Sequence, residues 1–341
     1  SPIDGRYGKK TEILADYFSE MALIKYRIKT EIVYLKHLSQ SGIIGMRKFT
    51  AEEEKILDDV YNITEEDALT VKKIETVGLD EIPATNHDVK AVEYFIKRKL
   101  QNTSLADVLE MVHFSLTSED INNLSTGMMV RDGMNEVILP QLETLYSSIY
   151  KLAFEHKADA MLARTHGQPA TPVTFGKEML VFVSRLKEEI KTLCSIDVLT
   201  KLNGATGGFN AHHCVFPNSD WISFSQSLME EFNKSSISKT SGFMQGLMFR
   251  LRYNPVTTQI EPHDSFARIF DSMKRINMIL IDFCQDIWRY ISDGWIKQRA
   301  VKGEIGSSAM PHKVNPIDFE NGEGNLGVAN AMFSFFGNKL P

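Results

Sequence analysis

The sequence has little cysteine, no excess of positive charge and no long apolar run. Its three cysteines, Cys194, Cys214 and Cys284, are odd in number and widely spaced, which argues against a disulfide framework and favours a reducing compartment. The formal net charge of -6 provides no basic surface for nucleic acid. No apolar stretch is long enough to cross a bilayer. We therefore expect a cytoplasmic protein that binds neither nucleic acid nor membranes, although a start at Ser1 leaves a removed targeting segment open.

Strand-like alternation is also scarce, and no repeat of roughly 20 to 50 residues occurs, which excludes solenoid folds. Helical periodicity dominates instead. Apolar residues recur over 266–290 in alternating steps of three and four, a seven-residue repeat typical of helices that supercoil against partner helices. Further helices are expected over 140–152, over 172–193 and within 103–132. The pattern predicts a mainly α fold built on a bundle of long helices.

Length and pattern together predict two domains in this chain. A chain of 341 residues exceeds one typical domain. Residues 1–104 have the pattern of shorter helices with more loops, and we assign them to an N-terminal helical domain. Residues 105–341 are assigned to a central long-helix bundle. The apolar stripes of this bundle are too broad for one subunit to cover, so we expect a homo-oligomer.

The segment with the clearest chemical content is 304–316, which reads E-I-G-S-S-A-M-P-H-K-V-N-P. Its residues 306–309 have almost no side-chain bulk, and Pro311 and Pro316 are incompatible with a helix interior or a central strand. What remains is a loop that carries two hydroxyls, an imidazole, an ammonium group and an amide. Loops of small residues beside rigid elements often hold catalytic groups, so we expect a mobile catalytic loop here.

This loop resembles the mobile-loop motif of the fumarase/aspartase superfamily of lyases. Further blocks resemble one family within it, the adenylosuccinate lyases: D-G-R-Y at 4–7, T-N-H-D-V-K at 85–90, T-S-E-D-I-N-N at 117–123 and R-T-H-G-Q-P-A-T-P at 164–172. The blocks lie in the family's order and span nearly the whole chain. The loop alone indicates a type of reaction, whereas the complete set indicates this family.

The resemblance implies an enzyme without cofactor or metal that breaks a carbon–nitrogen bond by β-elimination and releases fumarate. It would convert adenylosuccinate to AMP, and the succinylated imidazole carboxamide ribotide SAICAR to AICAR, in purine nucleotide biosynthesis. One alternative is another lyase of the superfamily, such as argininosuccinate lyase or aspartase, which should lack the 4–7 and 117–123 blocks. A second alternative is a non-catalytic structural protein on the same fold, which should have lost Ser307, His166 or Lys313. The sequence keeps all of these features.

The elimination needs a base for the carbon-bound proton, an acid for the departing nitrogen, and positive charge or donors around the developing carbanion. Ser307 is the candidate base by its place in the loop motif, with Ser308 as the neighbouring alternative. A serine hydroxyl becomes a base only in a closed, dry site, and a histidine as base stays open. His166 is the candidate acid. The resemblance places Glu320 as the carboxylate that orients it, and His87 as a second catalytic histidine.

The resemblance also implies a set of substrate-binding residues. Thr117 and Ser118 would begin a helix whose backbone amides favour anions, although a plain helix cap explains them as well. Arg6 and Tyr7 match positions that hold the nucleotide phosphate. The rest of the substrate site would be lined by Thr85, Asn86, Thr117, Ser118, Gln259, Lys313, Asn315 and Asn321. The run His212-His213-Cys214 contains residue types that bind metals, but adjacent residues lack the spacing of a zinc site.

Three expectations about the whole protein also come from the resemblance. The resemblance implies a homotetramer, and because the blocks around His87, Thr117, His166 and Ser307 lie far apart in the sequence, we expect its active sites to be shared between subunits. A third, C-terminal domain of the family should follow residue 341 and is absent from this chain. The stretch 232–252 looks like an insertion relative to the family, and we assign it no function.

Overall fold

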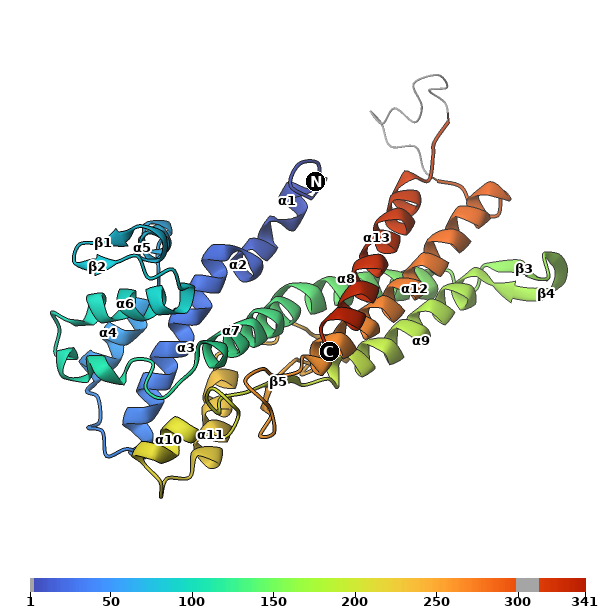
Figure 1. The fold of residues 1–341 in the computed structure, drawn as a ribbon. Coiled ribbons are helices and arrows are strands. Elements are labelled where there is room, and N and C mark those ends of the chain that lie inside the picture. Colours follow the sequence, from blue (N-terminus) through green and yellow to red (C-terminus); the bar gives the residue numbers. More distant parts are fainter. Residues whose placement is uncertain (1–2, 299–312) are drawn as a thin grey trace. The chain divides into compact units, whose positions relative to one another are not determined.

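A computed structural model describes residues 3–298 and 313–341, and within them the chain is mainly helical with short strands (Figure 1). The predicted mainly α fold class is confirmed. The contacts divide the chain into two compact units, one formed by Ser1–Pro140 and Asp197–Pro262 and the other by Gln141–Ile196 and His263–Pro341. A domain boundary near residue 104 stays a prediction. None of the described helices is long and apolar enough to cross a membrane.

The first unit contains most of the shorter helices. Its helices are α1 (Gly8–Thr11), α2 (Ala15–Phe18), α3 (Glu20–Ser41), α4 (Ala51–Tyr61), α5 (Glu65–Thr76), α6 (Asp88–Leu100), α7 (Ser118–Gly133), α10 (Asn210–Val215) and α11 (Trp221–Lys234). Its strands are β1 (Gly78–Leu79), β2 (Ile82–Pro83), β5 (Val198–Thr200) and β6 (Leu251–Tyr253). Tight 3-10 turns lie at Glu12–Leu14, Ala106–Met111 and Gly242–Met244, and a π-helical turn, Met134–Ile138, follows α7.

A hydrophobic core joins α3, α4, α5 and α6 in this unit. Ile28 and Leu35 of α3 contact the same cluster as Leu57 of α4, Ile74 of α5 and Phe95 of α6, and each is at most 1% exposed. The starting points of α4 and α5 are set by residues next to them in the sequence. Capping boxes begin both helices, formed by Thr50 with Glu53 and by Thr64 with Asp67.

The stretch 232–252 contributes to the core of this unit, although most of its residues are exposed or half-buried, and its interpretation as an insertion relative to the family stays a prediction. Strand β6 pairs in parallel with β5, with Val198 opposite Leu251. Phe249 is fully buried, and its backbone N–H and C=O are both bound by the Asn135 side chain, at 2.8 and 3.0 Å. Polar residues at the start of the stretch obscured these buried positions in the sequence.

The helix predicted within 103–132 is wrong as a single element. The first part of this range forms a 3-10 turn, Ala106–Met111, and helix α7 begins only at Ser118. Between them His113 and Ser115 have left-handed backbones, with φ of 61° and 57°. The buried carboxylate of Glu31 on α3 accepts hydrogen bonds from the backbone and ring nitrogens of His113, at 3.1 and 2.6 Å. A distant residue therefore fixes this break, and local periodicity does not reveal it.

The second unit consists of long helices and one hairpin, with α9, α12 and α13 side by side (Figure 1). Its elements are α8 (Leu139–Glu155), which starts at the boundary, β3 (Ala160–Thr165), β4 (Gln168–Thr174), α9 (Phe175–Cys194), α12 (Asp264–Ser292) and α13 (Ile317–Lys339). The helices expected over 140–152 and 266–290 are confirmed as α8 and α12. The seven-residue repeat of α12 is buried or half-buried throughout. The helix expected from 172 instead begins at Phe175, because Pro172 pairs with Leu162 in the hairpin.

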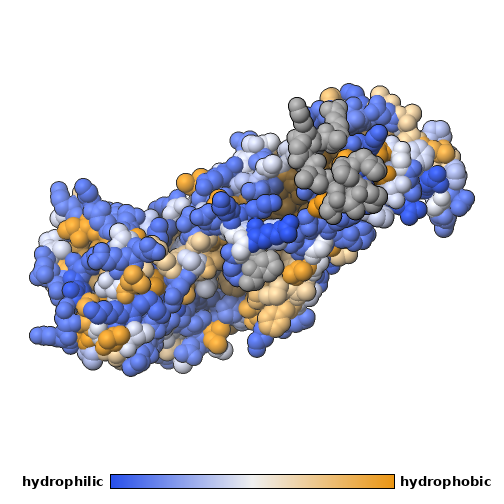
Figure 2. Space-filling view, turned by 90° about the horizontal axis from the view of Figure 1, so that it is seen from above, coloured by the Kyte–Doolittle hydropathy of each residue, from blue (hydrophilic) through white to orange (hydrophobic). Residues whose placement is uncertain are grey.

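Helix α13 has an apolar face that the described chain leaves uncovered. None of its residues is buried, although its ring contacts with α12 include Phe270 with Phe333 at 5.7 Å. Val328, Met332 and Phe335 recur on one face at helical spacing and are 68%, 49% and 55% exposed. Figure 2 shows that hydrophobic residues interrupt a mostly hydrophilic surface on the face it draws.

Candidate active site

The loop before α6 is held in a fixed shape by its own polar groups. Backbone N–H groups of Thr85 and Asn86 donate to carbonyls at the end of α5, at 3.1 and 2.9 Å. Asn86 has a left-handed backbone with φ of 48°. His87 caps α6, since its Nδ1 accepts the backbone N–H of Lys90 at 3.3 Å. An imidazole whose Nδ1 accepts carries its proton on Nε2, so the capping contact selects the tautomer of His87.

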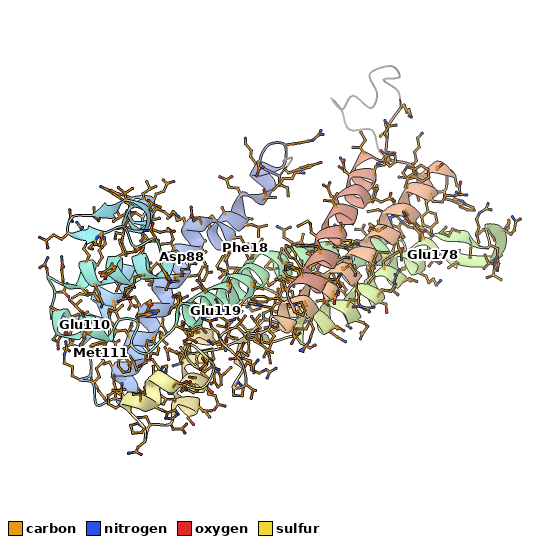
Figure 3. All side chains as sticks on the ribbon, in the orientation of Figure 1. Phe18, Asp88, Glu110, Met111, Glu119 and Glu178 are labelled. Carbon is orange, nitrogen blue, oxygen red and sulfur yellow. The ribbon has the colours of Figure 1, made fainter. Side chains whose placement is uncertain are left out.

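The free edge of this imidazole meets the beginning of α7. His87 Nε2 lies 3.2 Å from Ser118 Oγ, so the ring donates to the hydroxyl. Figure 3 labels the neighbours Asp88 on α6 and Glu119 on α7, which mark the two helix starts. The structure thus brings together two of the sequence blocks, 85–90 and 117–123.

A buried arginine fixes the two helix starts relative to each other. Arg27 of α3 is 8% exposed, and its Nη2 lies 2.6 Å from Asp88 Oδ2 while its Nε donates to Asn122 Oδ1 at 2.9 Å. Burial by itself would raise the pKa of Asp88, but the charge and hydrogen bond of Arg27 lower it below its usual value. Asp88 therefore stays ionised and keeps the link. The sequence analysis missed Arg27, because nothing in its local sequence marks it.

Asp120 and Lys201 form an ion pair under the start of α7, with both side chains fully buried and Nζ 3.0 Å from Oδ1. The Asp120 carboxylate also accepts the backbone N–H of Thr117 at 3.0 Å, which is the local reason why α7 begins here. It further accepts the N–H groups of Asn203 and Gly204, each at 3.1 Å. The sequence analysis missed this pair as well. Asp120 lies inside the 117–123 block, which was its one available signal.

Gln259 contacts the buried Asp120–Lys201 pair through its backbone carbonyl. Its carbonyl accepts from Lys201 Nζ at 2.8 Å, and its side chain is exposed. The turn beside it is tight, since a Cβ at Gly207, where φ is +78°, would lie 2.2 Å from Thr257 O. Thr257 Oγ1 in turn accepts from Asn203 Nδ2 at 2.8 Å. The first unit therefore joins Thr117 and Gln259 through the buried Asp120–Lys201 pair, and an exposed hydrogen bond joins Ser118 to His87.

Arg6 and Tyr7 lie near the described beginning of the chain. Arg6 is exposed and Tyr7 is half-buried. The carbonyl of Tyr7 accepts the backbone N–H of Lys10 at 2.8 Å at the start of α1. Their part in phosphate binding stays a prediction.

The remaining candidate residues belong to the second unit. His166, with φ of 53°, and Gly167 form the tip of the β3–β4 hairpin, where Arg164 Nη1 donates to Gly167 O at 2.9 Å. Glu320 lies in the first turn of α13, and its Oε1 accepts from Trp288 Nε1 of α12 at 3.2 Å. Among the described residues no hydrogen bond joins Glu320 to His166, so their pairing stays a prediction. Lys313 and Asn321 are exposed and Asn315 is half-buried. Ser307 and Ser308 lie outside the described residues.

The chain is similar to known proteins both in sequence and in fold. The sequence profile of the family described as Lyase matches residues 5–330. In solved structures, a 3-carboxy-cis,cis-muconate lactonizing enzyme from Pseudomonas putida shares the fold with a TM-score of 0.66 at 18% identity, over 97% of this chain and 66% of that one. A fumarate lyase from Mesorhizobium sp. BNC1 gives a TM-score of 0.63 at 16% identity, over 95% of this chain and 64% of that one. The fold and the motif blocks thus define a lyase of the fumarase/aspartase superfamily.

Curated sequences narrow this class to one family. The chain is 47% identical to the adenylosuccinate lyase of Vibrio cholerae and 45% identical to that of Escherichia coli, each over 344 residues. It is 45% identical to that of Dictyostelium discoideum over 348 residues. Each match covers 100% of this chain and 70% of the relative. The chain belongs to the adenylosuccinate lyase family.

Proposed function

We propose that the protein cleaves adenylosuccinate to AMP and fumarate, and SAICAR to AICAR and fumarate, in purine nucleotide biosynthesis. The observation that carries the proposal is the hydrogen bond between His87 and Ser118, which joins two family motif blocks at the first turn of α7. The N-terminus of a helix favours anions such as the carboxylates of a succinyl group. The comparisons give no support to the alternatives, which were another superfamily lyase or a structural protein.

The chemistry assigns one task to each part of the site. A base removes a proton from the carbon beside a carboxylate, the carbon–nitrogen bond breaks, and an acid protonates the departing nitrogen. We propose Ser307 as base and His166 as acid, with Glu320 beside it. Thr117, Ser118, Gln259, Lys313 and Asn315 would hold the succinyl part, and Arg6 and Tyr7 the phosphate. The rest of the substrate site would be lined by Thr85, Asn86, His87 and Asn321. The backbone amides of α7 and the ammonium of Lys313 would stabilise the negative charge that develops on the carboxylate.

We further propose that the site is assembled from several subunits of a cytoplasmic homotetramer. His87 and Ser118 lie in one compact unit, whereas His166 and Glu320 lie in the other. The uncovered apolar face of α13 supports assembly, since exposed apolar faces of this kind mark interaction surfaces.

The proposed activity is tested by adding adenylosuccinate to the purified full-length protein and measuring fumarate. We expect stoichiometric release of AMP and fumarate, and the same with SAICAR. Argininosuccinate and aspartate serve as controls, because the other superfamily lyases would release fumarate from them. Fumarate from a control substrate but not from adenylosuccinate would refute the assignment.

A further inference from the structure

The buried ion pair Asp120–Lys201 requires an explanation beyond stability. Both side chains are fully buried. Removing two charges from water costs several kcal/mol per ion, and a well-packed apolar pair of similar volume is often equally or more stable. A pair of this kind therefore contributes little to stability by itself. Its hydrogen bonds indicate what else it does.

The side-chain hydrogen bonds of this pair reach the start of α7 and the loop of Gln259, which hold candidate residues, and also the turn at 203–208. Asp120 accepts from the backbone of Thr117, beside Ser118, and from the backbone of Asn203 and Gly204. Lys201 Nζ donates to Gly204 O at 2.9 Å and to Gln259 O at 2.8 Å. The start of α7, the turn at 203–208 and the loop of Gln259 are thus bound to one pair of charges. Ser118 extends the connection to His87.

We propose that Asp120 and Lys201 are positioning residues. Together with the 203–208 turn that they bind, they hold Gln259 at a set distance from Thr117 and Ser118 so that these three residues can bind one succinyl moiety together. This inference rests on the proposed function. Neither side chain contacts the substrate, since both lie beneath the loops. Preorganised donors bind without the cost of ordering them, so the pair acts on substrate binding through the backbone.

The experiment replaces both charges at once in the full-length protein. Asp120→Asn or Lys201→Met alone leaves a buried charge unpaired and should lower the melting temperature strongly. The double variant Asp120→Asn/Lys201→Met leaves no buried charge and should regain most of the lost stability. In this double variant no ammonium group holds Gly204 and Gln259. The KM of the double variant for adenylosuccinate should therefore stay about tenfold or more above that of the parent protein, with a smaller change in kcat.

A matched control is the double variant Arg131→Met/Asp132→Asn. That pair is also buried, with Nε 2.7 Å from Oδ1, and lies at the other end of α7. It binds Tyr26 and the backbone of Phe232, and, in the part of the chain that the structure describes, none of the candidate site residues. Its KM should match that of the parent protein, even where its melting temperature is lower. An equal rise in KM in both double variants would assign the effect to general loss of stability and overturn the inference.

A crystal structure of the Asp120→Asn/Lys201→Met variant provides a readout that does not need activity. We expect Gln259 and the 203–208 turn to move by ~1 Å relative to Thr117, a misplacement sufficient to impair a site. Unmoved segments overturn the inference whatever the kinetics show, and so do moved segments with an unchanged KM. A parent protein that releases no fumarate from adenylosuccinate refutes the proposed function, and the crystal structure then decides the inference alone.

Discussion

His212 illustrates how burial controls a single ionisable residue. It is fully buried between aromatic rings, with ring centroids 5.3 Å from Phe209 and 4.7 Å from Trp221. Neither ring nitrogen has a hydrogen-bond partner in the described structure. Burial lowers the pKa of His212 to about 4, which the nearby charge of Asp120 offsets in part. The imidazole is therefore neutral in the folded protein at neutral pH.

This pKa makes the stability of the protein depend on pH. In the unfolded chain His212 becomes protonated below about pH 6.5, whereas in the folded chain it stays neutral until the pH falls to about 4. The free energy of unfolding should therefore fall on acidification through this window, by ~2 kcal/mol at pH 5. The His212→Met variant should lose correspondingly less stability than the parent between pH 7 and 5 in urea unfolding. Replacing the exposed neighbour, His213→Met, is the control, and parallel curves for parent and His212→Met would contradict the prediction.

The proposed base gives a second prediction for a single side chain. Ser307→Ala removes the proton acceptor but leaves Lys313 and the first turn of α7 in place. The variant should bind adenylosuccinate and lose turnover by several orders of magnitude, as when one member of a catalytic unit is removed. Ser308→Ala should be much milder, His166→Ala severe, and Glu320→Gln intermediate. Single-turnover kinetics and equilibrium binding measure the two effects separately. Near-normal turnover of Ser307→Ala would move the role of base to a histidine.

At the scale of elements, the close approach of α9 to the end of α8 depends on one glycine. A Cβ at Gly176 would lie 2.3 Å from Ala153 O and 2.6 Å from Lys157 Cα, and these are backbone atoms that cannot rotate away. Gly176 N also donates to His156 O at 2.9 Å. The second residue of α9 thus rests directly on the backbone that follows α8, and the β3–β4 hairpin lies between the two helices in sequence.

Gly176→Ala should therefore push these elements apart and destabilise the protein by ~2–3 kcal/mol, the typical cost of overpacking. Gly324→Ala is the matched control, because a Cβ there meets no atom within 4 Å and alanine favours a helix by roughly 0.5–1 kcal/mol. Thermal unfolding of both variants measures the difference. Equal melting temperatures would show that α9 and the end of α8 can separate at no cost.

Sequence patterns predicted the elements that bury a regular stripe and missed the breaks that distant contacts create. The repeat of α12 and the proline at the start of α8 are local signals, and both helices were found. The break before α7 depends on Glu31. The hairpin before α9 contains prolines, and because proline is common in the first turn of a helix, they suggested that the helix starts earlier than it does. The motif blocks predicted the loops of the candidate site, and the structure joins two of these blocks, at His87 and Ser118. Arg27 and Lys201 escaped notice, because their roles arise from partners far along the chain.

At the scale of the whole molecule, α13 presents apolar side chains that the described chain leaves exposed. Val328, Met332 and Phe335 are exposed, whereas Phe333 of the same helix contacts Phe270 of α12. Val328→Glu combined with Phe335→Glu should shift the protein from the proposed tetramer to smaller species and reduce activity in parallel, because charges in an apolar interface are unpaired and desolvated. Sedimentation velocity measures the change. Ser223→Glu with Gln226→Glu adds equal charge to the exposed, polar side of α11 and should leave assembly intact, whereas unchanged assembly in the α13 variant would exclude this face from the interface.

Shared active sites make a final prediction that needs two inactive proteins. His87→Ala spoils the contribution of the first unit, and Ser307→Ala spoils the loop that a neighbouring subunit would supply. When the two variants are mixed, dissociated and reassembled, some sites should receive both intact contributions, so partial lyase activity should return. His87→Ala mixed with Ser118→Ala is the control, since these side chains are hydrogen-bonded within one unit at 3.2 Å and come from the same subunit. That mixture should stay inactive, because no site in it can combine an intact His87 with an intact Ser118. No recovery in the first mixture, with hybrid oligomers confirmed by native mass spectrometry, would mean that each subunit builds its site alone.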